Sequence, residues 1–386
     1  MTVPVIASTT APGQRQRRDA LSYLFGIVLL IAAAAMATAA LTTVTLTTPA
    51  WGQQTNDTTP AESPTGGRVP GNVLGDQADA DMWRAVRGGV EGTVSIPDKQ
   101  AGRLIQSQGS DWRAVRNGPV TVYGAWAMLG IVAIIALFFA VRGRIRIDAG
   151  PAGTTIERFN MLERTAHWII ASSFVVLALT GLNILYGRHV LLPILGPDIF
   201  SAITIAGKYA HNFLSFAFMV GLVMIFVLWI RRNIPRRRDL HWLAVGGGLF
   251  KKGVHPAAGK FNAGQKLIFW SVILGGISIS LSGLALMFPF EFSLFGKTFA
   301  VLNLVGFDLP ANLAPIHEMQ LSQLWHGIVA LILIAIIIGH IYIGSLGMEG
   351  AFEAMGSGQV DLNWAKEHHS EWVDEIRSGR QPQAAE

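Results

Sequence analysis

The sequence predicts an all-α, polytopic membrane protein. Hydrophobic residues make up 51% of the chain and charged residues 14%, a composition typical of membrane proteins rather than of soluble domains. A bilayer core about 30 Å thick needs about 20 consecutive apolar residues in a helix. Six segments reach that length, at approximately 21–41, 121–141, 166–186, 209–230, 267–288 and 321–346.

The first apolar segment has the features of a secretory signal. Arg15, Arg17 and Arg18 precede it, and small residues such as Ala50 and Gly52 follow it, which is the order found in signal peptides. Because the apolar run is long for a cleaved signal, residues 1–52 are predicted to be a signal peptide or an uncleaved signal anchor.

The segment that follows, 53–119, is predicted to lie outside the membrane. Its first part is rich in Thr, Pro and Gly and is typical of a flexible linker. The sequence WRAVR then occurs twice, beginning at Trp83 and at Trp112. The two copies are either similar helical turns packed against a membrane face or a docking element for an external partner, with Trp and Arg as its anchors.

Basic residues are distributed unevenly among the loops, and this predicts the orientation of the spans. Five arginines lie between the second and third spans, and nine lysines and arginines lie between the fourth and fifth. The short connections on the other side carry only Arg188 and Lys208, then Lys297. The positive-inside rule therefore places the two basic loops and both termini in the cytoplasm. The predicted organisation is an additional span at 120–142, a four-span core at 156–347 and a cytoplasmic tail at 348–386.

The chain contains no cysteine. This excludes a covalently attached c-type haem, cysteine-ligated iron–sulfur clusters and structural thiolate zinc sites. A redox cofactor would have to be held by histidine or methionine, or be buried without a covalent bond. The net charge of +5 comes from basic loop residues, and no nucleic-acid-binding pattern accompanies it.

His326 and His340 are the most informative residues of the sequence. They lie fourteen residues apart in one apolar segment, so both imidazoles leave the same face of a helix and are separated by about 21 Å along its axis. One helix thus presents a nitrogen ligand near each surface of the bilayer, as two stacked haems b require. A histidine in a span can instead bond to another helix or relay protons, and a haem-free transporter is the corresponding alternative.

The predicted topology also selects partners for these two residues. His167 begins the third span near the cytoplasmic side, and His211 begins the fourth near the outer side. We therefore expect the pairs His167–His340 and His211–His326, each holding the iron of one haem b between two helices. The other six histidines are predicted to be solvated or interfacial, and they are His189, His241, His255, His317, His368 and His369. Of these, His317 is the rival outer ligand.

Two basic residues stand three positions before a predicted ligand. Arg164 precedes His167 on the inner side, and Lys208 precedes His211 on the outer side, so each shares its ligand's helix face. We expect them to contact haem propionates, or otherwise to be ordinary cations at the ends of spans.

From residue 156 to 375 the sequence resembles the cytochrome b (gamma) subunits of membrane-bound respiratory formate dehydrogenases. The matching stretches are ERTAHW at 163–168, RNIP at 232–235, KFNAGQK at 260–266, GHIY at 339–342 and WAKEHHSEW at 364–372. The resemblance implies a four-helix transmembrane diheme cytochrome b core, in which His167, His211, His326 and His340 hold two haems b. The first two apolar segments and the linker have no counterpart in the four-span form of that family.

The resemblance further implies partners and an electron acceptor. A periplasmic iron–sulfur (beta) subunit and a molybdenum- or tungsten-containing catalytic (alpha) subunit would deliver electrons to the outer haem, and the inner haem would reduce membrane quinone on the cytoplasmic side. The chain would then be the quinone-reducing subunit and not the one that oxidises formate. The alternative is the diheme cytochrome b of a membrane-bound hydrogenase or another molybdenum oxidoreductase, which would use the same haems with a different soluble head.

The family's quinone pocket lies beside the inner haem, against the loop that here contains Asn262, Gly264 and Gln265. The side-chain amides of Asn262 and Gln265 could donate hydrogen bonds to a quinone carbonyl. The alternative is that Asn262 is the N-cap of the fifth span, because it precedes the apolar segment by a few residues.

Overall fold

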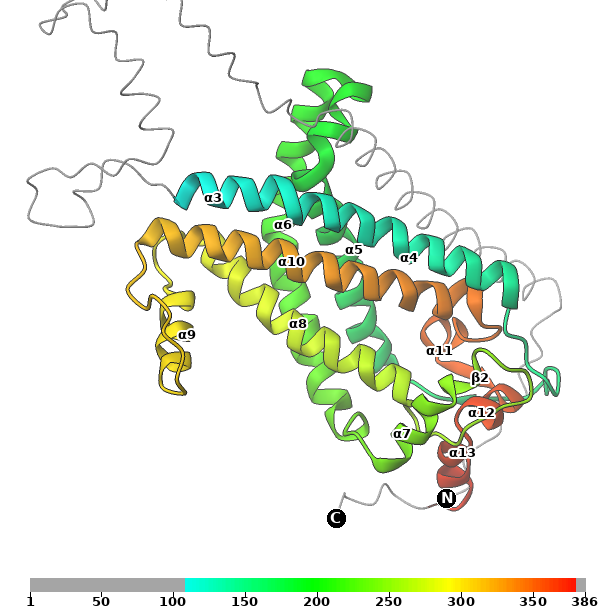
Figure 1. Cartoon of the computed structure of the whole chain (residues 1–386). Coiled ribbons are helices and arrows are strands. Elements are labelled where there is room, and N and C mark those ends of the chain that lie inside the picture. Colours follow the sequence, from blue (N-terminus) through cyan, green and yellow to red (C-terminus); the bar gives the residue numbers. More distant parts are fainter. Residues whose placement is uncertain (1–107, 380–386) are drawn as a thin grey trace, which may run out of the picture. The chain divides into compact units, whose positions relative to one another are not determined.

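The computed structural model describes residues 108–379, and these are predominantly helical (Figure 1). The predicted signal segment and the first WRAVR copy lie outside the described residues. Five helical stretches of the described chain are long and apolar enough to cross a membrane, and they agree with the five predicted spans that fall within the described residues. They are Gly109–Arg142, Met161–Val190, Leu192–Arg232, Ala263–Met287 and Pro315–Gly347. The prediction of an all-α, polytopic membrane protein is thus confirmed.

The long stretches and their connections contain elements of several kinds. The α-helices are α3 (Gln108–Val115), α4 (Thr121–Arg142), α5 (Met161–Val190), α6 (Leu192–Trp229), α7 (Arg237–Ala244), α8 (Ala263–Met287), α9 (Leu294–Asn303), α10 (Pro315–Tyr342), α11 (Glu353–Gly356), α12 (Leu362–His368) and α13 (Ser370–Arg377). The π-helices η1 (Arg116–Val120) and η4 (Ile343–Gly347) precede α4 and follow α10, and the 3₁₀-helices are η2 (Ile230–Arg232) and η3 (Gly246–Gly248). The strands are β1 (Thr155–Glu157) and β2 (Gln359–Asp361).

The described residues form two compact units. The larger unit comprises Gly124–Leu281 and the chain from His326 onward, and the smaller comprises the residues before Gly124 together with Ser282–Trp325. The larger unit contains all four predicted ligands, most of the spans and the C-terminal tail.

α5 begins at Met161 because Asn160 caps it. The side chain of Asn160 accepts a hydrogen bond from the backbone N–H of Glu163 at 2.9 Å, and the Glu163 carboxylate accepts one from the backbone N–H of Asn160 at 3.0 Å. This reciprocal capping box satisfies two donors that the first turn of a helix leaves open. The helix therefore starts before the predicted position 166 and places His167 in its second turn.

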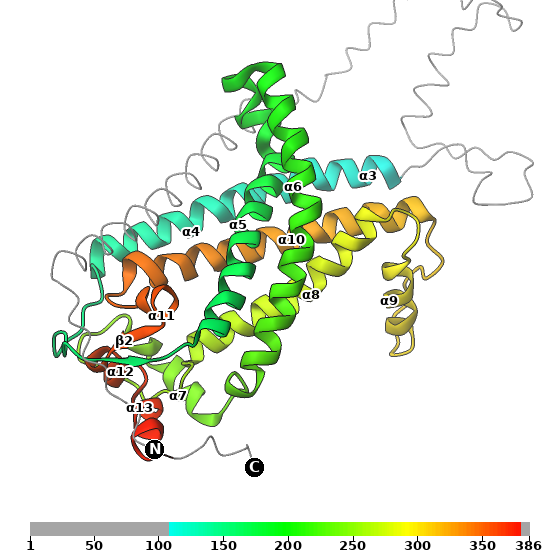
Figure 2. The same cartoon turned by 180° about the vertical axis from the view of Figure 1, so that it is seen from behind.

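α5 and α6 lie side by side as an antiparallel pair joined at Leu191, which Figure 2 shows from behind. Gly221 of α6 permits the close approach, because a Cβ added there would lie 2.9 Å from the backbone nitrogen of Ile170. Such contacts between small residues and a neighbouring backbone are common among membrane helices. Near its start α6 bends at Gly196, which has a φ of 74°, a conformation that glycine adopts at little cost.

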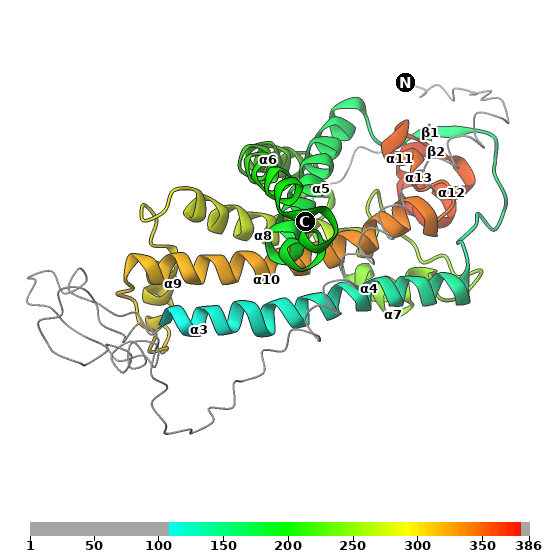
Figure 3. The same cartoon turned by 90° about the horizontal axis from the view of Figure 1, so that it is seen from above.

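The additional helix α4 runs beside the second half of α10 (Figures 1 and 3). Near its start, a Cβ added to Gly124 would lie 2.6 Å from Leu331 Cδ1, so the glycine packs closely against the side chain of Leu331. Beyond its end, Ile145 forms a parallel bridge with Met348, through backbone hydrogen bonds of 2.8 Å to Gly347 and from Glu349. α4 is therefore fixed to α10 at both ends.

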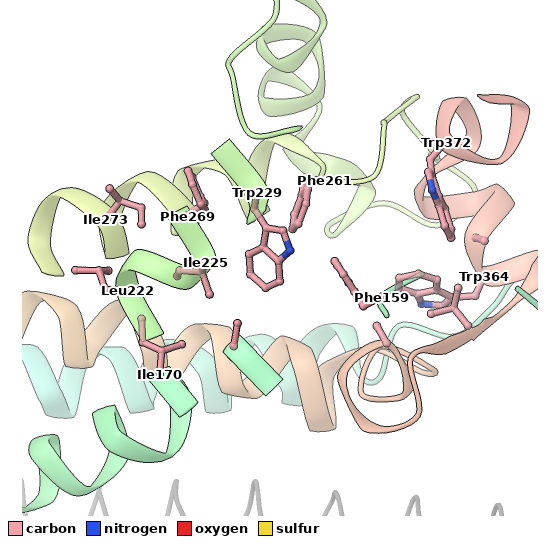
Figure 4. Close-up of a cluster of buried hydrophobic side chains, with 14 of the residues drawn as sticks. Phe159, Ile170, Leu222, Ile225, Trp229, Phe261, Phe269, Ile273, Trp364 and Trp372 are labelled. Carbon is pink, nitrogen blue, oxygen red and sulfur yellow. The ribbon is translucent and has the colours of Figure 1, made fainter. Parts of the chain in front are cut away.

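The C-terminal tail folds back onto the start of α5. β1 pairs antiparallel with β2, with Ile156 opposite Val360. Aromatic side chains from distant parts of the chain then form a buried cluster, in which the rings of Phe159, Trp229 and Phe261 have centroids 5.3 to 5.6 Å apart (Figure 4). The tail after 348 is thus part of the folded core at this end of the spans.

The smaller unit is organised around Glu318 in the first turns of α10. Its side chain is 4% exposed, and its carboxylate accepts hydrogen bonds from the backbone N–H groups of Phe295 and Gly296 at 2.9 and 2.6 Å. These donors belong to the first turn of α9, where a carboxylate is favourable. Glu318 therefore anchors α9 to α10.

Candidate functional site

The four predicted ligands lie in two pairs. The ring centroids of His167 and His340 are 6.3 Å apart, and those of His211 and His326 are 6.2 Å apart. In both pairs the ring planes are inclined by 60°, and all four side chains are half-buried. The structure therefore brings together the same residues that the topology paired.

The two separations fit two imidazoles bound on opposite sides of one metal ion. A metal–imidazole nitrogen bond is about 2.0–2.1 Å long and a ring centroid lies about 1.1 Å behind its nitrogen, so two such centroids would be about 6.3 Å apart. Two imidazoles joined by a direct hydrogen bond would have centroids only about 5 Å apart. The residues present thus fit a bis-histidine haem at each pair.

Thr180 of α5 holds His211 in one tautomer. Thr180 Oγ1 lies 2.8 Å from His211 Nδ1, and it also lies 2.8 Å from the backbone carbonyl of Val176. The hydroxyl has one proton, which it donates to a carbonyl of its own helix, so Nδ1–H of His211 donates to Oγ1. Nε2 of His211 is then unprotonated and available to bind iron, as is usual where the second ring nitrogen of a ligand is hydrogen-bonded.

The other ligands differ in how their second nitrogen is placed. The ring of His326 donates to the backbone carbonyl of Ile279 in α8, which orients it as Thr180 orients His211. Among the described residues, Nδ1 of His167 is a buried nitrogen with no hydrogen-bond partner. A buried polar atom in this state calls for a ligand or a water molecule.

The two predicted propionate contacts lie in different surroundings. Arg164 donates to the backbone carbonyl of Gly356 at 2.7 Å and, more weakly, to that of Met355 at 3.4 Å. In the structure its guanidinium therefore attaches the tail to α5. Lys208 lies exposed on α6, one turn before His211. Contact of either residue with a propionate stays a prediction.

Asn262 and Gln265 form the capping box of α8. The side chain of Asn262 accepts from the backbone N–H of Gln265 at 2.9 Å, and the side chain of Gln265 accepts from the backbone N–H of Asn262 at 3.1 Å. The structure thus contains the N-cap that was the alternative explanation of Asn262. Gly264 packs closely against Trp242, since an added Cβ would lie 3.0 Å from Cη2 of Trp242.

Arg158 joins this loop to the start of α5. Its side chain is 4% exposed, and Nη2 donates to the carbonyl of Lys260 at 2.8 Å and to Oε1 of Gln265 at 3.2 Å. The guanidinium also lies 5.0 and 5.1 Å from the ring centroids of Phe159 and Trp364. Burial lowers the pKa of Arg158 to about 9, and the nearby Glu163 carboxylate opposes this shift. The residue therefore stays a cation at neutral pH and connects the loop, α5 and the tail.

Glu163 is the second charged residue buried at this end. Besides capping α5, it accepts from Nζ of Lys260 at 2.6 Å and from Nε1 of Trp229 at 3.0 Å. Burial lowers the pKa of Lys260, whereas its hydrogen bond to Glu163 raises it. The carboxylate lies one helical turn before His167, so it fixes the part of α5 that carries this ligand.

The prediction that the tail histidines are solvated is wrong for His369. Its side chain is completely buried, and Nδ1 donates to the carbonyl of Gly259 at 2.7 Å. His368 is half-buried, with its ring centroid 5.2 Å from that of Trp364 and 6.0 Å from that of His255. The sequence shows only a charged tail after the last span, whereas folding of the tail against the loop before α8 creates this burial.

Several residues of the site were not predicted from the sequence. Thr180 and Arg158 lie in none of the motifs quoted from the sequence, and Glu163 lies in the ERTAHW stretch without a role predicted for it. Each of the three acts through a partner on another element. A threonine in the outer half of an apolar helix was an available signal for Thr180, because such hydroxyls usually bond to their own helix or to a neighbour. The contact of His326 with Ile279 could not be predicted, because it involves a backbone carbonyl, which every residue has.

Comparison with known proteins agrees with the geometry. A family model described as prokaryotic cytochrome b561 matches residues 158–358, which include all four histidines. The cytochrome b556(Fdn) subunit of the nitrate-inducible formate dehydrogenase of Escherichia coli (strain K12) is 28% identical over 233 residues, which cover 60% of this chain and 96% of the relative.

Two further relatives have similar names. The cytochrome b556(fdo) subunit of a formate dehydrogenase from the same organism is 27% identical over 232 residues, 60% of this chain and 97% of the relative. The formate dehydrogenase cytochrome b556 subunit of Haemophilus influenzae is 27% identical over 226 residues, 58% of this chain and 84% of the relative. The resemblance noted from the sequence is thereby confirmed, and the matched part begins after α4.

Proposed function

Since this chain belongs to the prokaryotic cytochrome b561 family, we propose that it is the membrane cytochrome b subunit of a formate dehydrogenase complex. It would take electrons from an iron–sulfur subunit outside the membrane and pass them to quinone at the cytoplasmic side. The names of its relatives support formate as the origin of the electrons. An iron–sulfur subunit and a molybdenum or tungsten catalytic subunit are the proposed partners.

The observation that carries the proposal is the spacing of the two histidine pairs. Both pairs include a residue of α10, and His326 and His340 are fourteen residues apart on it, which separates them by about 21 Å along the axis. Each bound haem b would supply a one-electron carrier. The four histidines hold these groups at two depths of the bilayer, and Thr180 and the Ile279 carbonyl orient the outer pair.

Quinone reduction is proposed to occur beside the inner pair. Asn262 and Gln265 lie in the loop that Arg158 attaches to the start of α5, and α5 carries His167. Quinone needs two protons as well as two electrons, and the end of the spans near this loop is the one predicted to face the cytoplasm. A hydrogen bond from either amide would orient the quinone carbonyl.

Haem content tests the ligand assignment. The unaltered protein, purified in mild detergent, should contain two haems b per chain and show a b-type α band in its reduced-minus-oxidised spectrum. His211→Ala and His326→Ala should each leave one haem, because either change removes an axial ligand of the outer site. Two haems in either variant would refute the assignment, and absence of a b-type spectrum from the unaltered protein would refute the cytochrome itself.

The electron donor is tested separately. In native membranes, formate should reduce the haems of this chain, and hydrogen should not. Copurification should recover subunits with iron–sulfur clusters and a molybdenum or tungsten cofactor. Reduction by hydrogen with a copurifying nickel protein would instead identify the cytochrome b of a hydrogenase.

A further inference from the structure

α7 has one face attached to the rest of the protein. Asp239 forms an ion pair with Lys266 at 2.7 Å, and both side chains are largely buried. Arg238 pairs with Glu371 of α13, and the ring of Trp242 lies against Gly264. These three side chains are grouped on one side of α7. With Arg237 set to zero, Arg238, Trp242 and Asp239 project at about 100°, 140° and 200° around the helix axis.

The opposite face of α7 is exposed and apolar. Leu240 is 70% exposed and Leu243 41% exposed, and Ala244 beside them is exposed as well. A helix at a water-exposed surface shows the reverse pattern, with its apolar residues directed inward. Exposed leucines in this position are typical of a helix whose outer face meets the apolar part of a membrane interface.

The surroundings of α7 lie at the level of the membrane surface. α7 lies in the connection between α6 and α8 (Figure 1), and both are candidate spans. Phe250, which follows α7, is 73% exposed, yet its ring meets that of Phe138 edge to face with centroids 5.7 Å apart. Phe138 belongs to another candidate span, so the segment reaches the depth at which spans leave the bilayer.

Four exposed cations flank the apolar residues of α7 in the sequence. Arg236, Arg237, Lys251 and Lys252 are exposed, and within residues 108–379 none of them forms an ion pair. The carboxylates near the segment have other partners. Asp239 and Glu371 pair as described above, and Glu375 pairs with Arg232. Asp148 accepts from the backbone N–H of Gly253 and contacts Nε2 of His255. The segment thus combines exposed apolar side chains with uncompensated positive charge.

We propose that α7 and the segment up to Lys252 form a binding site for anionic phospholipid. Anionic head groups would contact Arg236 and Arg237 at the start of α7 and Lys251 and Lys252 beyond its end, and acyl chains would contact Leu240, Leu243 and Phe250. Amphipathic helices with basic flanks bind the membrane interface in this way. The inference does not depend on which soluble partner the chain has.

The test measures which lipid remains on the protein. The full chain is reconstituted into vesicles with equal amounts of phosphatidylcholine and phosphatidylglycerol, extracted in mild detergent, and its bound lipids are counted by mass spectrometry. The unaltered protein should retain an excess of phosphatidylglycerol. Each cation removed should lower that preference about fivefold, so the variant Arg236→Gln/Arg237→Gln/Lys251→Gln/Lys252→Gln should lose it.

A matched variant controls for unspecific charge. Arg188→Gln/Lys297→Gln removes two exposed cations, from the last turn of α5 and from α9, and should keep the excess. Arg236→Gln/Arg237→Gln removes the same number from the proposed site and should lower it. Titration of the unaltered protein with salt repeats the test without any substitution, because screening should abolish the preference. Equal retention of the two lipids by the unaltered protein, an unchanged excess in the fourfold variant, or an equal loss in the control would each overturn the proposal.

Discussion

Thr180 and His211 are joined by a hydrogen bond of 2.8 Å between two adjacent membrane helices. The threonine hydroxyl donates to its own helix and accepts from the imidazole, so this one contact selects the tautomer of a proposed haem ligand. Gly181 lies beside the ring, since a Cβ added there would be 3.5 Å from Cε1 of His211. The ligand is thus oriented by a residue that is not itself a ligand.

Replacing Thr180 should weaken the outer haem site. Thr180→Val keeps the shape of the side chain but removes the acceptor for Nδ1–H of His211, and losing such a partner typically lowers metal affinity about 10–100-fold. We expect the outer haem to be lost first during purification or haem-transfer assays. Thr180→Ser, which keeps the hydroxyl, should retain it, and equal haem affinity in the Val and Ser variants would contradict the role of the hydrogen bond.

Asn262 can be tested for its two roles with two substitutions. Asn262→Leu removes the cap of α8 and should lower stability by about 1 kcal/mol. Asn262→Asp keeps a capping oxygen but has no amide to donate, so it should preserve the melting temperature. If Asn262 also donates to quinone, the Asp variant should bind quinone up to about tenfold more weakly. Quinone affinity that is unchanged in the Asp variant would limit Asn262 to its role as a cap.

The ion pair between Glu163 and Lys260 should be essential for the stability of the inner end. The two side chains are only 10% and 15% exposed, and removing one member of a buried pair typically costs 3–5 kcal/mol. Glu163→Gln and Lys260→Met should each lower the melting temperature of the detergent-solubilised protein. The double variant should be less damaged than the sum of the two, since no charge is then left alone, and strict additivity would show that the two residues do not interact.

The tail should become less stable as the pH falls from about 6.5 to about 4. Burial lowers the pKa of His368 to about 4, with additional effects of His255 and Arg158 and opposition from Asp148. Burial also lowers the pKa of His369 well below its usual value, and Arg158 adds to the shift. Between these pH values the unfolded tail binds more protons than the folded tail, so stability rises with pH, by up to about 1.4 kcal/mol per pH unit for each histidine.

Limited proteolysis of the tail measures this dependence. Cleavage of the unaltered protein should increase as the pH is lowered through the window. In the variant His368→Gln/His369→Asn, whose amides replace ring nitrogens but do not titrate, the increase should be much smaller. His241→Asn serves as the control because His241 is exposed. An identical pH profile in the double variant would show that other groups titrate.

The spans could be predicted because their length and composition are local properties. The rings that topology paired lie together in the structure, since the depth of a residue in the bilayer follows from its position in a span. The exact start of α5 depended on the reciprocal bonds of Asn160 and Glu163. The sequence contains the residues of this capping box, but the predicted span was placed by its apolar residues alone, which begin several positions after Met161.

Contacts between distant segments could not be predicted in this way. β1 and β2 contain only three residues each, too few for a recognisable strand pattern. The burial of His369 depends on the carbonyl of Gly259, and carbonyl groups are present at every position. Likewise, the orientation of His211 follows from Thr180 only once α5 and α6 are known to be adjacent.

The pairing of β1 with β2 also has a consequence for biosynthesis. β1 precedes α5, whereas β2 is synthesised after every described span. During translation the spans can therefore enter the bilayer one after another, while the start of α5 still lacks its strand partner and Arg158 lacks the ring of Trp364. A nascent chain stalled before residue 359 would have all of its described spans in the membrane, but β1 would still lack its strand partner. Membrane insertion and completion of the fold are thus separate events in the life of this protein.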